Sequence, residues 1–342
     1  MTDQNRNSRR EFLKKMAAAA AVATITGTYD LLSAYPADSR NGAMPLRKLG
    51  KTGHKVGIYS LGGQATIETP GKEEMAVELV NKALDLGINY IDTAAAYGRS
   101  TETLSRRDAM GTSEKNIGQV MKTRRKEVFL ASKTHDRTYD GSMKLLDKSL
   151  MNLQTDHLDL WQVHNLRASE KGNLDAYFAE DGVIKAMEKA RDEKMVKNIG
   201  ITGHEDPEIL KMMAERYDFD NVLVAINAAD KHYNSMIEKF LPVAVERKMG
   251  IVGMKIPARD RIFDFGGIIN MKEAMDYVMS LPVSTVIIGI DRISELEENM
   301  KIAREFKQLS ADELLAIEDK AKPHYEHLQF FKDGIGKWPA EW

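Results

Sequence analysis

Four side chains that can hold or move a proton lie at the ends of short apolar runs. Asp92 and Tyr97 close one run, Lys133 closes the next and His164 the one after. A carboxylate, a phenol, an ammonium group and an imidazole are the usual groups of general acid–base chemistry. Each alone is a weak signal, because an Asp can cap a helix, a Lys can be solvated and a His can pack at a rim. At successive run ends, they predict one site if the fold gathers those ends.

The apolar runs are the elements that must position these residues. They are rich in Val, Ile and Leu on both faces, which is typical of strands in a buried parallel sheet. The eight candidates are Gly57–Gly62, Ile88–Thr93, Val128–Ser132, Leu158–Val163, Val196–Ile201, Val222–Ile226, Gly250–Met254 and Thr285–Ile288.

Amphipathic patterns typical of helices lie between the runs. They span Glu73–Asp85, Lys144–Leu153, Val183–Glu193, Pro207–Arg216, Met236–Arg247, Met271–Met279 and Ile293–Phe306. Alternating strands and helices at a spacing of about 30 residues predict a (β/α)8 TIM barrel, in which functional side chains sit at the carboxyl ends of the strands. An open doubly wound sheet would want a G-x-G-x-x-G after its first strand, and Gly62-Gly-Gln-Ala-Thr-Ile67 is not one.

Two further pieces frame the predicted barrel. Leu46 to Val56 reads as a β-hairpin that turns at Lys51–Gly53 and plugs one end of the barrel. Ser310 followed by Glu313 is a capping box that starts an extra C-terminal helix.

The most specific motif is Gly87-Ile-Asn-Tyr-Ile-Asp-Thr-Ala-Ala-Ala-Tyr-Gly98. Leu49-Gly-Lys-Thr-Gly-His-Lys-Val56, Leu158-Asp-Leu-Trp-Gln-Val-His164 and Gly289-Ile-Asp-Arg-Ile-Ser-Glu-Leu-Glu-Glu-Asn299 accompany it. On these segments the chain resembles the aldo-keto reductase family from Leu46 to about Ile302. The resemblance implies a nicotinamide-dependent oxidoreductase with Asp92, Tyr97, Lys133 and His164 as its catalytic group.

The implied roles agree with the chemistry of these side chains. Reducing a carbonyl requires a hydride donor and a proton donor, and a free tyrosine, with a pKa of about 10, holds its proton firmly. We expect Lys133 to lower the pKa of Tyr97, with Asp92 holding the lysine in place. We expect His164 to donate a hydrogen bond to the carbonyl oxygen.

The resemblance also implies an extended nicotinamide cofactor across the strand ends. The residues expected to hold it are Gly63, Asn165, Thr202, Asn227, Lys255, Gly289, Arg292, Glu295, Glu298 and Asn299. Asp291 stands where many relatives carry a basic residue for the 2′-phosphate of NADP, and a carboxylate repels that group. The cofactor is therefore expected to be NADP(H) or NAD(H).

Three departures from the family pattern surround the cofactor and substrate positions. Thr202-Gly203-His204 replaces the usual Ser-Asn after the fifth strand, and Leu223 and Ile226 replace a Gln and a stacking aromatic at the sixth. A longer loop, Arg99 to Gly111, follows the catalytic tyrosine and is expected to reshape the substrate pocket. His204, Asp230 and His232 could be drawn as metal ligands, but helix caps and rim contacts explain them as well, and we expect no metal.

Composition excludes several classes of protein. The 342 residues contain no cysteine, which excludes disulfides, thiolate nucleophiles, Cys-ligated zinc and iron–sulfur clusters. The formal net charge of -2 gives no electrostatic reason to expect a nucleic-acid partner.

The N-terminus resembles an export signal. Ser8-Arg-Arg-Glu-Phe-Leu-Lys14 before a modest apolar run matches the twin-arginine (Tat) pattern, and the run is too short for a stable membrane span. We expect residues 1–34 to be the Tat signal peptide, 35–45 a linker and 46–342 the barrel. The Tat export machinery would then be a partner of the precursor, and the mature protein would be periplasmic or otherwise exported.

The sequence thus predicts an exported oxidoreductase that moves hydride between a nicotinamide cofactor and a small aldehyde, ketone or sugar carbonyl. A periplasm has no free pool of reduced nicotinamide, so the cofactor is expected to be tightly bound. A catalytically silent barrel, serving as a nicotinamide-binding or regulatory subunit, remains the alternative.

Overall fold

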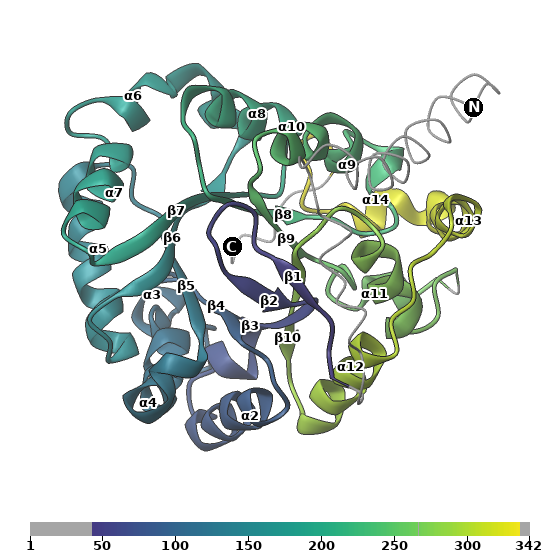
Figure 1. The fold of residues 1–342 in the computed structure, drawn as a ribbon, viewed down its shortest axis with the longest axis horizontal. Helices are drawn as coiled ribbons and strands as arrows, with labels where there is room; N and C mark the ends of the chain where they lie inside the picture. The colour runs from purple at the N-terminus through teal and green to yellow at the C-terminus, as the bar shows by residue number, and fades with distance from the viewer. Residues whose placement is uncertain (1–42, 266, 336–342) are drawn as a thin grey trace.

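The computed structural model describes residues 43–265 and 267–335, so the expected signal peptide and most of the expected linker lie outside the described residues. Eight parallel strands close into a barrel in the order β10-β3-β4-β5-β6-β7-β8-β9, ringed by helices (Figure 1). They are β3 (Tyr59–Ala65), β4 (Tyr90–Asp92), β5 (Phe129–Thr134), β6 (Leu158–Leu166), β7 (Val196–Gly203), β8 (Asn221–Ala225), β9 (Gly250–Met254) and β10 (Thr285–Ile290). The predicted (β/α)8 barrel is confirmed.

The surrounding helices follow the predicted positions with local differences. They are α2 (Glu73–Asp85), α3 (Arg106–Ala109), α4 (Thr112–Arg124), α5 (Tyr139–Leu153), α6 (Asp175–Phe178), α7 (Val183–Asp192), α8 (Pro207–Arg216), α9 (Met236–Lys239), α10 (Leu241–Glu246), α11 (Met271–Met279) and α12 (Ile293–Arg304). No helix of the described residues is long and apolar enough to cross a membrane.

Two differences have clear physical causes. The helix predicted over Met236–Arg247 is broken at Phe240, because Pro242 lacks the N–H that an uninterrupted helix needs and instead sits in the first turn of α10. Helix α4 is not among the helices expected from amphipathic patterns. Its buried face carries polar and small residues such as Glu114, Asn116 and Gly118 beside Ile117 and Val120, so it shows little apolar periodicity.

The amino end of the barrel is closed by the predicted hairpin. Strands β1 (Leu46–Lys48) and β2 (Lys55–Gly57) pair antiparallel and lie across the barrel opening in Figure 1. Leu49 and Val56 are fully buried in one cluster with Tyr90, Phe129 and Leu160 from the barrel interior. The apolar plug therefore seals the end of the barrel opposite the predicted site.

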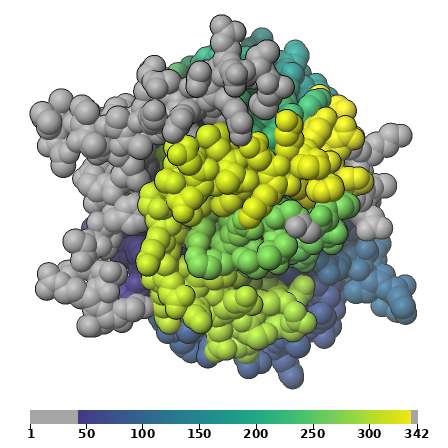
Figure 2. Space-filling view, turned by 90° about the vertical axis from the view of Figure 1, so that its right-hand side faces the viewer, coloured from purple at the N-terminus to yellow at the C-terminus, as the bar shows by residue number. Residues whose placement is uncertain are grey.

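The C-terminal segment packs against one side of the barrel. Helices α13 (Ala311–Ala321) and α14 (Tyr325–Leu328) form a yellow band across its side in Figure 2. The predicted capping box starts α13, with Ser310 Oγ accepting from the Glu313 N–H at 3.3 Å. Beyond α14, the chain turns inward, and Phe330 and Phe331 join the interior cluster beside Met254 at the carboxyl end of β9.

Candidate active site

The four residues predicted as catalytic meet at the carboxyl end of the barrel. Asp92 is the last residue of β4, Lys133 lies in β5 and His164 in β6, while Tyr97 follows in the turn after β4. Lys133 Nζ forms an ion pair with Asp92 and donates to the Tyr97 hydroxyl at 3.1 Å. The Tyr97 and His164 rings meet edge to face, with centroids 5.6 Å apart.

Asp92 and Lys133 are fully buried and satisfy each other. Burial raises the pKa of Asp92 and lowers the pKa of Lys133, and the attraction between the two charges opposes both effects. Gln162 donates to the second oxygen of Asp92 at 3.1 Å, and Lys133 also donates to the Thr93 carbonyl at 2.7 Å. The lysine is therefore fixed in position directly beneath the Tyr97 hydroxyl.

The net effect on Tyr97 is opposite to the expectation from the sequence. The contact with Lys133 is present, but burial, followed by the negative charges of Asp92 and Glu68, raises the pKa of Tyr97 well above 10. The phenol consequently keeps its proton over the whole physiological range. Such a group has a proton to give but releases it only when a strong acceptor develops beside it.

His164 is held in the neutral form. Burial lowers its pKa well below 6.5, and the cations Lys133 and Arg137 and the rings of His204 and His135 add to this effect. A neutral imidazole has one N–H to donate and carries no charge of its own.

A cavity of about 240 Å³ opens beside this group. It is lined by Asp92 and Tyr97, which are predicted to be catalytic, and by three of the residues predicted to hold the cofactor, Gly63, Lys255 and Gly289. Asp291 also lines it, and its carboxylate accepts from the Thr66 hydroxyl at 3.1 Å. The carboxylate noted in the sequence is therefore part of the cavity wall.

The cavity is also lined by residues that the sequence patterns did not indicate, namely Gln64, Glu68, Arg259 and Asp260. Arg99, which begins the long loop expected to reshape the substrate pocket, lines it as well. Lys255, Arg259 and Asp260, which follow β9, have positive φ values of 61°, 59° and 66°. Non-glycine residues rarely adopt this conformation, and it recurs at functional sites. The sequence signal that could have indicated Arg259 is its position four residues after Lys255, just beyond the end of β9.

The other predicted cofactor residues lie in two groups outside the cavity lining. Arg292, Glu295, Glu298 and Asn299 lie at the start of α12 and along it. Arg292 pairs with Glu295 at 2.5 Å and is 74% exposed, while Asn299 is buried. Their predicted contact with the cofactor stays a prediction.

Asn165, Thr202 and Asn227 are occupied by contacts within the chain. Thr202 is fully buried, and its hydroxyl accepts from the Asn165 N–H at 2.7 Å. The Asn165 side chain pairs with His204 at 2.7 Å. Asn227 is fully buried and accepts from Gln329 of the C-terminal segment at 2.6 Å. Their cofactor roles likewise stay predictions.

The C-terminal segment provides aromatic rings at the barrel mouth. Leu223 and Ile226, which replace the family's Gln and stacking aromatic, are fully buried and do not line the cavity. Leu223 instead shares a cluster with Phe330 and Phe331. Lys332 anchors this segment through an ion pair of 2.6 Å with Asp230, and both side chains are fully buried.

The residues drawn as possible metal ligands are each held elsewhere. His204 pairs with Asn165, Asp230 with Lys332, and His232 Nε2 with the Glu318 carbonyl at 2.8 Å. No group of three or more His, Asp or Glu side chains in residues 43–265 and 267–335 is arranged to hold a metal ion.

Known proteins that resemble this chain in sequence or in fold are oxidoreductases. An uncharacterized oxidoreductase of Bacillus subtilis is 24% identical over 82% of this chain and 97% of its own length. L-galactose dehydrogenase of Arabidopsis thaliana is 26% identical over 78% of this chain and 91% of its own. The fold is shared with an aldo-keto reductase of Bacillus halodurans in its holo form, with a TM-score of 0.66, 22% identity and coverage of 81% and 96%.

The family assignment rests on the catalytic strands themselves. The model of the aldo/keto reductase family matches residues 55–256, which include the ends of β4, β5 and β6. This chain therefore belongs to the aldo/keto reductase family and is a nicotinamide-dependent oxidoreductase.

Proposed function

We propose that Tyr97 is the general acid that protonates the carbonyl oxygen of the substrate. Its hydroxyl oxygen accepts from Lys133 at 3.1 Å, which leaves its own O–H free to donate, and Tyr97 lines the cavity. This arrangement is the observation that carries the proposal. As negative charge develops on the carbonyl oxygen, the phenol proton moves to it and the Lys133 charge stabilises the phenolate left behind.

His164 orients the carbonyl in this proposal. Its ring meets the edge of the Tyr97 ring, and its neutral state leaves an N–H for the carbonyl oxygen. Two donors then converge on one oxygen, so the carbon beside it becomes electron-poor and open to hydride.

The residues around the cavity suit part of a nicotinamide dinucleotide, which supplies the hydride when bound. Lys255 and Arg259 line its β9 side and can pair with phosphate oxygens. Gly62, Gly63 and Gly289 also line the cavity, so backbone without side chains is exposed there to an approaching cofactor.

We propose a sugar or a related polyhydroxylated carbonyl compound as the substrate. Gln64, Glu68, Arg99 and Asp260 place hydrogen-bonding groups around the cavity, beside apolar residues such as Met254 and Ile287. Glu68 is 5% exposed, and Gln64 donates to it at 3.4 Å, so a carboxylate is available to accept from hydroxyl groups. The resemblance to an enzyme named for L-galactose agrees with this choice.

The export leader and the tight cofactor remain part of this proposal. The Ser8-Arg-Arg motif supports transport of the precursor through the Tat route, which carries folded proteins. Enzyme exported with a bound cofactor would need the cofactor to be reoxidised in place, as in a reaction that oxidises and then reduces the same sugar. Mass spectrometry of the denatured, purified protein should find stoichiometric nicotinamide dinucleotide, and its absence would rule out the tight cofactor. Replacing Arg9 and Arg10 by lysine should keep the protein in the cytoplasm.

The catalytic assignment is tested with Tyr97→Phe. The variant loses only the phenol oxygen, so we expect carbonyl reduction to fall by about 10³-fold or more, while the dissociation constant of the nicotinamide nucleotide stays within about twofold. Stopped-flow reduction of a sugar and of a simple aldehyde, with nucleotide binding followed by fluorescence, measures both. Full activity of the variant would refute the role of Tyr97.

A further inference from the structure

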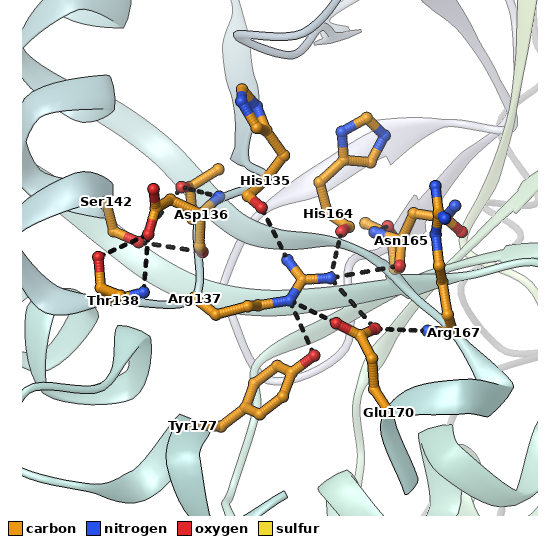
Figure 3. A network of polar contacts seen from close by, with 12 residues as sticks. His135, Asp136, Arg137, Thr138, Ser142, His164, Asn165, Arg167, Glu170 and Tyr177 are labelled. Carbon is orange, nitrogen blue, oxygen red and sulfur yellow. Dashed lines mark hydrogen bonds and ion pairs between the residues drawn. The ribbon is translucent and has the colours of Figure 1, made fainter. Parts of the chain in front are cut away.

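Arg137, in the loop between β5 and α5, binds the backbone that carries His164. Its Nη2 donates to the His164 carbonyl at 3.0 Å and to the Asn165 carbonyl at 3.4 Å. Its Nη1 donates to the His135 carbonyl at 3.4 Å. Figure 3 shows the guanidinium group below the two strand ends, with the imidazoles of His135 and His164 directed away from it.

The guanidinium group is itself held on its other side. Arg137 Nε donates to Glu170 at 2.9 Å and to the Tyr177 hydroxyl at 2.8 Å, and Nη2 reaches the second Glu170 oxygen at 3.3 Å. That oxygen also accepts from the Arg167 N–H at 2.8 Å. A planar guanidinium with a bidentate carboxylate has little freedom to rotate.

The backbone at His164 needs these donors. The pairing of β6 with β7 runs regularly to Val163 and resumes only at Leu166, so His164 and Asn165 lie in a break of the ladder. Asn165 also has a positive φ of 56°, in the left-handed region that residues other than glycine, asparagine and aspartate rarely adopt. Arg137 therefore supplies the hydrogen bonds that the neighbouring strand does not make at this point.

We propose that Arg137 is a positioning residue that fixes the break in β6 so that the His164 imidazole faces Tyr97. The inference rests on the proposed role of His164 in the reaction. Besides Arg137, four charged or titratable groups lie around the imidazole. They are Lys133 in β5, His135 just after β5, His204 after β7 and Tyr97 after β4. Lys133 and Arg137 carry the fixed positive charges of this set.

The test compares Arg137→Met with Arg137→Lys and with a matched control, Arg125→Met. Arg125 lies before β5 at the opposite end of the same two strands, where it also binds two carbonyls and an aspartate. We expect Arg137→Met to lower kcat by about 10- to 100-fold with little change in the KM of the nucleotide, and Arg137→Lys to recover part of the loss. Arg125→Met should lose thermal stability but keep the wild-type kcat per folded molecule.

A second readout does not depend on turnover. In protein labelled with ¹⁵N-histidine, with the His164 signals assigned from a His164→Asn variant, loss of the Arg137 charge should raise the pKa of His164. The imidazolium form should then appear at higher pH than in the wild type and in Arg125→Met. An unchanged His164 titration together with an unchanged kcat would overturn the proposal, as would equal losses of kcat in both arginine variants. If the wild type reduces no carbonyl, the proposed function fails, while the titration still decides the role of Arg137.

Discussion

An arginine binds backbone carbonyls at each end of strands β5 and β6. The two arginines differ in the backbone that they hold. At the amino end, Arg125 donates to the Val128 carbonyl at 2.8 Å and to the His157 carbonyl at 3.0 Å, and it pairs with Asp159 at 2.7 Å. At the carboxyl end, Arg137 holds strand-end carbonyls in the same way and pairs with Glu170.

The difference lies in the backbone between the contacts. The carbonyls at Arg125 precede strands that pair regularly below an apolar plug. The carbonyls at Arg137 belong to a break in the ladder with a left-handed residue, next to a cavity lined by titratable groups. The same interaction therefore contributes stability at one end and is expected to contribute geometry and charge at the other, as is general for the two faces of this barrel.

The largest expected difference in kcat is between variants of two buried aspartates, one at each end of the barrel. Asp92→Asn removes the counter-charge of Lys133, so the buried lysine loses its charge more readily and no longer stabilises a phenolate at Tyr97. We expect kcat to fall by on the order of 10² to 10³. Asp159→Asn, at the amino end, should leave kcat within about twofold. Steady-state kinetics of both variants measures this, and equal effects would erase the functional distinction between the ends.

Arg125→Met should be the more damaging change to stability at the amino end. It leaves the Val128 and His157 carbonyls and part of Asp159 without partners, and we expect the free energy of unfolding to fall by about 2 to 3 kcal/mol. Urea denaturation of the cofactor-free protein, with unchanged m, would give this value. A variant as stable as the wild type would show that Lys197, which also pairs with Asp159 at 2.8 Å, suffices there.

The affinity of the carboxyl end for the nucleotide should also depend on pH, through the cations proposed to bind it. Burial lowers the pKa of Lys255 to about 7, with Arg259 adding to the effect. Lys255 is therefore charged below about pH 7 in the free enzyme, and affinity for the anionic nucleotide should weaken as pH rises from there, by at most tenfold per unit. Calorimetric titration between pH 6 and 8.5 measures this dependence. Lys255→Met should bind the nucleotide more weakly, and its affinity should depend less on pH. A pH dependence like that of the wild type in this variant would show that Lys255 is not its cause.

The smallest effect should be an acid dependence of stability at the amino end. Burial raises the pKa of Asp159, but hydrogen bonds and charges from Lys197 and Arg125 outweigh it and hold the pKa below its ordinary value. The stabilisation is thus fully present above the unfolded-state pKa near 4 and is lost as pH falls through the lower folded-state pKa. Asp159→Asn should flatten the loss of unfolding free energy below pH 4. If the free energy of unfolding falls as steeply in the variant, other carboxylates cause the acid dependence.

Local patterns in the sequence determined much of this protein. The eight apolar runs became the eight barrel strands, Ser310 and Glu313 formed the capping box, and the four residues predicted to be catalytic met as expected. These features could be predicted because periodicity, caps and strand order act over a few residues, and because parallel strands carry their ends to one edge.

Tertiary structure alone decided the environment of that site. Only the fold buried Tyr97, and this burial, with the nearby charges of Asp92 and Glu68, reversed the expected shift of its pKa. It brought Gln329 onto Asn227 and Lys332 onto Asp230 from 102 residues away along the chain. It also set Arg137 beneath His164. The sequence determined which groups are available for chemistry, whereas burial and long-range contacts, which no local pattern encodes, decided their charge and orientation.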